Sequence, residues 1–135
     1  MVKKRYWVSV VLWAAIILIL CGMPPQDVEK IKLFEIPYQD KIVHFMLYFV
    51  LALLVMALLT LNSTLRKTRW TYLLTILICL LYGWIIEVFQ RTFFPGRSFE
   101  WMDVVADTAG AVIGVLLYRS ISSFVKKRWK IFDEL

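Results

Sequence analysis

The sequence has few residues that form covalent or metal-bound cross-links, with two cysteines and one histidine among 135 residues. Cys21 and Cys79 both lie within apolar runs, where a free thiol behaves as a small hydrophobic side chain. Their spacing matches no zinc-binding pattern, so we expect no disulfide, no metal and no cofactor. Internal repeats and low-complexity segments are also absent, and the length favours a single domain over residues 1–135.

A cleavable signal sequence is not indicated either. Basic residues at positions 3–5 precede an apolar run from residue 6 to about residue 23, but no small-residue cleavage pattern follows it. Leu20, which precedes Cys21, is unlike the small residue expected at that place in a lipoprotein signal. We interpret the run as an uncleaved first membrane helix, with a signal peptide as the alternative.

Charged residues are scarce and apolar residues abundant. Hydrophobic residues make up 61% of the chain and its mean hydropathy is +0.71, whereas a soluble domain is about half apolar. The excess falls into four runs separated by short charged segments, and a run of about 20 residues spans the hydrocarbon core of a bilayer. The sequence therefore predicts an all-α, polytopic four-helix membrane bundle, with helices near 6–23, 41–61, 70–91 and 103–123.

The basic residues indicate an orientation. A net charge of +6 would suggest nucleic acid as the partner of a soluble protein. Here lysine and arginine cluster beside the ends of apolar runs, at both termini and at 62–69, so we expect no nucleic-acid partner. The positive-inside rule then predicts that both termini are cytoplasmic and that 24–40 and 92–102 face outward from a bacterial cytoplasmic (inner) membrane.

This topology brings polar residues from three helix ends to the same outer side. Residues three or four apart share a helix face, so each helix presents its polar residues together. The candidates are Asp40, Lys41 and His44 on the second helix, Glu87, Gln90 and Arg91 on the third, Arg97 and Ser98 in the hairpin, and Asp103 and Asp107 on the fourth. Tyr48 shares the face of Lys41 and His44, and Gly110 and Gly114 share the face of the two aspartates.

Some of these residues have ordinary structural interpretations. The Gly110–Gly114 pair is a GxxxG motif that lets two helix backbones approach closely. Asp40 and Asp103 are placed to act as helix N-caps. Glu87 and Asp107 are harder to explain in this way, because an unpaired carboxylate within an apolar helix costs a few kcal/mol.

Four motifs occur in order: DKIVHFMLYF on the second helix, IEVFQ on the third, then FPGRS, and DVVADTAGAVIG on the fourth. Together, over about residues 40–114, they resemble the VanZ-like family of small membrane proteins, named for a protein associated with teicoplanin resistance. The resemblance implies a membrane protein of poorly understood biochemistry. Asp107 departs from the family, which usually has asparagine there, so an uncharged-amide role is in doubt.

Two classes of function fit the candidate site. In the first, the protein acts on or binds an amphiphilic envelope molecule such as a lipid headgroup, a lipid-linked precursor or a lipoglycopeptide, and so contributes to glycopeptide resistance. The catalytic candidates are then Glu87, Asp107 and His44, and the substrate-binding candidates are Lys41, Arg97, Gln90, Ser98, Asp40 and Asp103. In the second, the polar residues only fix helix packing and partner proteins carry the function. Assembly into an oligomer stays open.

Overall fold

The computed structural model describes residues 2–23, 38–61, 69–96 and 98–133. These residues form four helices and no strand: α1 (Val2–Cys21), α3 (Gln39–Thr60), α4 (Arg69–Phe93) and α5 (Trp101–Asp133). Each helix contains a stretch long and apolar enough to cross a membrane, so the predicted all-α polytopic architecture is confirmed.

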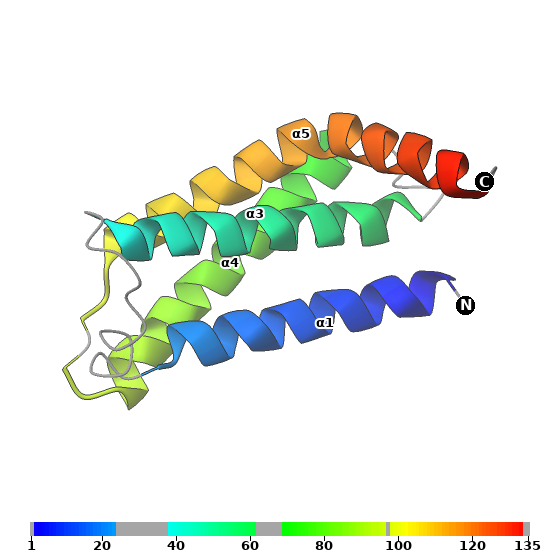
Figure 1. Cartoon of the computed structure of the whole chain (residues 1–135). Helices are drawn as coiled ribbons and strands as arrows, with labels where there is room; N and C mark the ends of the chain where they lie inside the picture. Colours follow the sequence, from blue (N-terminus) through cyan, green and yellow to red (C-terminus); the bar gives the residue numbers. More distant parts are fainter. Residues whose placement is uncertain (1, 24–37, 62–68, 97, 134–135) are drawn as a thin grey trace.

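The helices alternate in direction, so the beginning of α1 and the end of α5 lie at the same end of the bundle (Figure 1). At the other end, α1 and α4 finish while α3 and α5 begin. We call this the hairpin end, because residues 94–96 and 98–100, between α4 and α5, lie there. Which end faces the cytoplasm stays a prediction from the charge pattern.

The last helix is longer than its apolar run. The sequence predicts an end near residue 123, whereas α5 continues to Asp133. Its apolar span ends at Val125, so the helix runs on past the stretch that is apolar enough to cross a membrane. Helix formation needs backbone hydrogen bonds rather than apolar side chains, and lysine and arginine are good helix formers.

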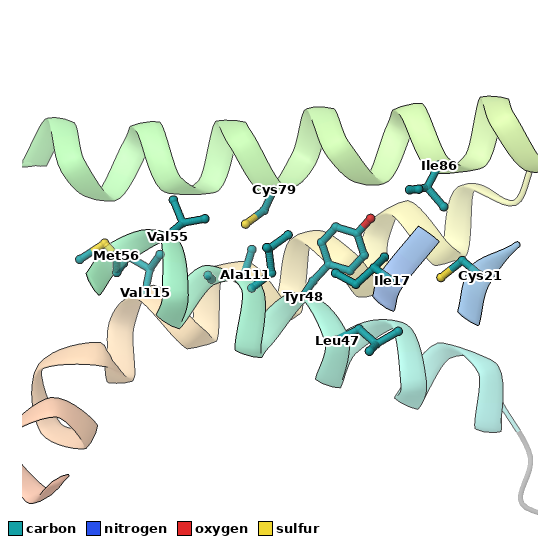
Figure 2. Close-up of a cluster of buried hydrophobic side chains, with 12 residues drawn as sticks. Ile17, Cys21, Leu47, Tyr48, Val55, Met56, Cys79, Ile86, Ala111 and Val115 are labelled. Carbon is teal, nitrogen blue, oxygen red and sulfur yellow. The ribbon is translucent and has the colours of Figure 1, made fainter. Parts of the chain in front are cut away.

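α3 is the central helix, because its contacts with α1, α4 and above all α5 are the most extensive in the bundle, whereas α1 and α5 do not contact each other within the described residues. Its buried face supplies much of the core. Figure 2 shows this core, whose members are Ile17, Cys21, Leu47, Tyr48, Leu51, Ala52, Val55, Met56, Cys79, Ile86, Ala111 and Val115.

α3 and α5 pack with their backbones close together. A Cβ atom added at Gly110 would lie 2.2 Å from the carbonyl oxygen of Phe45, and one added at Gly114 would lie 2.7 Å from that of Phe49. Any larger side chain at either position would therefore separate the two helices. This close approach brings the first turns of both helices, and the polar residues they carry, into contact.

α1 is attached by hydrogen bonds as well as by apolar contacts. The Trp13 indole donates to the carbonyl of Leu47 at 2.9 Å, and the Tyr82 hydroxyl donates to the carbonyl of Ala14 at 2.6 Å. The Gln90 amide donates to the carbonyl of Cys21, also at 2.6 Å. These bonds connect the second half of α1 to α3 and α4.

Candidate functional site

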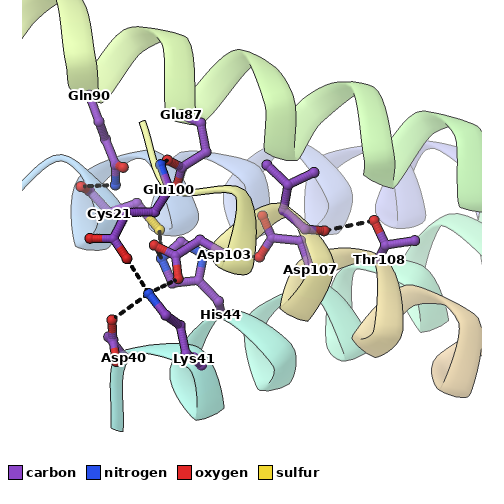
Figure 3. Close-up of polar contacts among 11 residues, drawn as sticks. Cys21, Asp40, Lys41, His44, Glu87, Gln90, Glu100, Asp103, Asp107 and Thr108 are labelled. Carbon is purple, nitrogen blue, oxygen red and sulfur yellow. Dashed lines mark hydrogen bonds and ion pairs between the residues drawn. The ribbon is translucent and has the colours of Figure 1, made fainter. Parts of the chain in front are cut away.

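Polar and ionisable side chains from all four helices converge at the hairpin end (Figure 3). Most of these side chains are buried, and the helix surfaces around them are apolar. We call them the polar cluster, which comprises Cys21, Asp40, Lys41, His44, Glu87, Gln90, Glu100, Asp103 and Asp107.

Lys41 supplies a positive charge to the polar cluster and lies between its half-exposed and its buried carboxylates. Its ammonium lies 2.6 Å from Asp103 Oδ1 and 2.8 Å from Asp40 Oδ2, and it also contacts Glu100 Oε2. Asp40 and Glu100 are about half exposed, whereas Asp103 is buried. An ammonium has three donor hydrogens, so three carboxylates already occupy the donors that an anionic ligand would need.

His44 lies deeper and is held by Asp107. Its Nδ1 lies 2.9 Å from Asp107 Oδ1, within hydrogen-bond distance. Its Nε2 lies 3.9 Å from Asp103 Oδ2, too long for a hydrogen bond, and 3.9 Å from Cys21 Sγ, a weak contact. A carboxylate on one ring nitrogen fixes the orientation of an imidazole and leaves the other nitrogen available. Here the available nitrogen faces Asp103 and Cys21.

Glu87 is completely buried and only partly satisfied. Its Oε2 accepts a hydrogen bond from the backbone N–H of Glu100 at 2.9 Å, which joins α4 to the start of α5. Its Oε1 has no hydrogen-bond partner among the described residues. One oxygen of Glu87 also lies within 4.8 Å of ligand atoms of His44 and Asp103.

Asp107 occupies space that a glycine leaves free. A Cβ atom at Gly83 of α4 would lie 2.6 Å from Asp107 Oδ2, so only glycine at that position admits the carboxylate without displacing it. Asp107 Oδ1 contacts His44, while Oδ2 has no partner in the described part of the chain. The position of the Asp107 carboxylate is therefore set by its contact with His44 of α3 and by the space that Gly83 of α4 leaves open.

Acidic groups outnumber basic groups in the cluster. It contains five carboxylates, Asp40, Glu87, Glu100, Asp103 and Asp107, against one lysine and one histidine. Even with a protonated imidazole, ionised carboxylates leave an excess of negative charge that is mostly buried. Buried charge is costly unless it is paired, so either some of these carboxyl groups are protonated or a further positive or hydrogen-bonding group balances them.

The N-cap interpretation of Asp40 and Asp103 is wrong. The residue before α3 is Tyr38, in a left-handed conformation, and no side chain caps that helix. Asp40 lies inside the first turn of α3 and Asp103 inside the first turn of α5. Both carboxylates contact the Lys41 ammonium instead.

The remaining candidates, including Gln90 of the cluster, do not share one environment. Gln90 is buried and donates to the Cys21 carbonyl, and buried Tyr48 has a hydroxyl without a partner among the described residues. Arg91 and Ser98 are exposed. Arg97, expected to bind substrate, lies outside the described residues.

Two members of the cluster were missed by the sequence reasoning. Glu100 contacts both Lys41 and, through its backbone, Glu87, but it stands alone in the hairpin without a periodic pattern. Cys21 was read only as a small hydrophobic residue. The position of each residue along its helix was the signal that could have identified Cys21, because α1 ends at the side of the bundle where α3 begins.

Comparison with known proteins gives a family and one uncharacterized relative. The family described as VanZ/LLP1 matches residues 5–123. An uncharacterized protein of Schizosaccharomyces pombe is 34% identical over 82 residues, which cover 61% of this chain and 48% of the relative. The matched region is thus about half the length of that relative. No solved structure matches this chain.

Proposed function

The chain belongs to the VanZ/LLP1 family, and from this premise we propose that it binds the polar part of an amphiphilic envelope molecule at the hairpin end. The molecule is a membrane lipid, a lipid-linked precursor or a lipoglycopeptide. The observation that carries the proposal is the burial of Glu87, Asp103 and Asp107, from two helices, around His44 of a third. Ionisable groups placed at such cost within membrane helices serve a ligand or a reaction more often than packing.

The surroundings of the cluster suit a molecule with a polar head and an apolar tail. Half-exposed Asp40 and Glu100 connect the buried groups to the surface. Apolar side chains are exposed within the first turns of the same helices: Ile42 and Val43 on α3, Trp101 and Met102 on α5. A tail lying along those helices would leave the head beside the cluster. Under the positive-inside rule, this end faces outward from a bacterial cytoplasmic membrane.

Binding is tested with purified protein in phosphatidylcholine nanodiscs, with teicoplanin as the acylated probe and a glycopeptide lacking the acyl chain as the comparison. We expect teicoplanin to bind more tightly than the comparison compound. Glu87→Gln and Asp107→Asn should each weaken its binding by about tenfold or more, the scale of one lost charged hydrogen bond. The matched control is Tyr118→Phe, which removes a hydroxyl that contacts Thr60 at the opposite end. Equal binding by the folded variants and the parent would refute the proposal.

A catalytic role is the second candidate, and the His44–Asp107 pair favours it. A histidine oriented by a buried carboxylate is the usual arrangement of a general base, and the other nitrogen of His44 has only weak contacts, with Cys21 Sγ and Asp103 Oδ2, both at 3.9 Å. If Glu87 or His44 acts chemically, Glu87→Gln or His44→Gln abolishes turnover of the bound amphiphile while leaving its affinity measurable. If affinity and cellular function fall together, recognition alone is supported.

A further inference from the structure

We propose that His44, Glu87 and Asp103 bind a divalent transition-metal cation, for which Zn²⁺ is the probe. From the sequence we expected no metal, because Lys41 and Arg97 would already compensate the carboxylates of Glu87, Asp103 and Asp107 near His44. In the fold, one ligand atom from each lies within 4.8 Å of the other two, and all three residues are buried. The inference deepens the proposed function and rests on it for the role of the metal, but not for its binding.

The distances fit ligands around an ion better than direct contacts. Nε2 of His44 and Oδ2 of Asp103 are 3.9 Å apart, too far for a hydrogen bond. Ligand atoms of a tetrahedral zinc ion, with bonds of about 2.0–2.1 Å, are about 3.4 Å apart. Side-chain shifts of no more than about 1.5 Å would therefore close the three groups around one ion.

Glu87 supplies an independent reason for a ligand. Its Oε2 accepts the N–H of Glu100, so a proton, if present, would sit on Oε1. That oxygen is buried and has neither a donor nor an acceptor among the described residues. Neither the ionised nor the protonated carboxyl group is thus satisfied by the described part of the protein. Figure 3 shows the Glu87 side chain extending from α4 toward Asp103 and His44. A cation bound between these three side chains would give Oε1 of Glu87 the partner that it lacks.

The neighbouring contacts prepare each ligand. The bond from His44 Nδ1 to Asp107 is the carboxylate–histidine pairing that typically orients a metal-binding imidazole and raises its basicity. Lys41 occupies Oδ1 of Asp103 and leaves Oδ2 directed toward His44. The positive ion would also balance part of the excess negative charge. One imidazole and two carboxylates are ligands that Zn²⁺ accepts, and three protein ligands leave a fourth position open.

The open position gives the metal its role in the proposed function. Lys41 is already surrounded by carboxylates, so the described cluster has no free positive charge for an anionic headgroup. A bound cation would provide that charge. Phosphate or carboxylate oxygen on the amphiphile would then become the fourth ligand.

The test is zinc titration of the full chain in phosphatidylcholine nanodiscs after chelator treatment, without added amphiphile. We expect one Zn²⁺ per chain, with affinity reduced at least about tenfold by the isosteric Glu87→Gln. The matched control is Asp40→Asn, which changes an exposed carboxylate of the cluster that is not one of the three ligands and should change affinity less than about threefold. Helical content measured without metal verifies that both variants are folded.

The outcomes separate this inference from the proposed function. Absence of stoichiometric binding, or binding that Glu87→Gln leaves unchanged, overturns the metal site. Loss of binding in Asp40→Asn but not in Glu87→Gln also overturns it, because the ion would then lie among the outer carboxylates. If zinc binds as expected but teicoplanin does not, the metal site stands and the choice of amphiphile is wrong.

Discussion

Replacing Gly110 with alanine tests whether the α3–α5 contact holds the site together. The added Cβ would lie 2.2 Å from the Phe45 carbonyl oxygen and 3.0 Å from its carbon. A carbon–oxygen contact normally requires about 3.3 Å, so the helices must separate by about 1 Å. Backbone cannot rotate away as a side chain can. Overpacking of this kind typically costs about 1–3 kcal/mol of unfolding free energy.

The same separation should reach the polar cluster, because Asp107 is one helical turn from Gly110. A displacement of about 1 Å would lengthen the His44–Asp107 contact beyond hydrogen-bond distance. Losing a contact that orients a metal ligand lowers affinity about 10- to 100-fold. Gly110→Ala should therefore reduce both the unfolding free energy and zinc binding.

The two quantities are measured by reversible unfolding in mixed SDS micelles and by zinc titration. The control is Ala109→Leu, which adds bulk at the neighbouring exposed position. We expect the control to change the unfolding free energy by less than about 0.5 kcal/mol. A Gly110→Ala protein as stable as this control would show that the helices are not in close backbone contact, and the reasoning would fail.

Three further predictions concern the site and the attachment of α1. Gly83→Ala should push the flexible Asp107 carboxylate aside and so lower the zinc affinity measured by titration about tenfold. The unfolding free energy should fall by less than about 1 kcal/mol. An unchanged zinc affinity would contradict this prediction. Lys41→Met should strengthen zinc binding about tenfold, because a neighbouring positive charge is removed; weaker binding would mean that Lys41 positions the ligands. Tyr82→Phe should cost about 1 kcal/mol in SDS unfolding through its lost bond to Ala14 and leave zinc affinity intact; equal stability would show that this bond does not hold α1.

The helices were predictable because apolar run length is a local property. Each of the four runs is long enough to span a bilayer, and the structure has a helix at each. The extension of α5 to Asp133 was not predictable by that criterion, because the run ends before the backbone hydrogen bonding does. The polar residues in the last turns of α5 mark the end of its apolar span, but they do not determine where the helix itself ends.

The polar cluster was predictable only in outline. Helix periodicity places Lys41 and His44 on one face and Asp103 and Asp107 on another, and alternating directions place both faces at the same end. Their pairing depends on the distance between helices, which the two glycines of α5 set. The N-cap interpretation of Asp40 and Asp103 was wrong for that reason. The sequence shows which residues could cap a helix locally, but it does not show that the Lys41 ammonium lies close to a carboxylate of another helix.

The hydrogen bonds that attach α1 have a consequence for its register. Lipid is as apolar as leucine, so apolar contact alone selects an axial position for a membrane helix weakly. Trp13 and the carbonyls of Ala14 and Cys21 instead fix α1 at two heights, near its middle and at its end. One residue inserted between positions 14 and 21 would rotate one attachment relative to the other by about 100° and shift it about 1.5 Å. The spacing of that segment is therefore constrained even though most of its side chains face lipid and are individually replaceable.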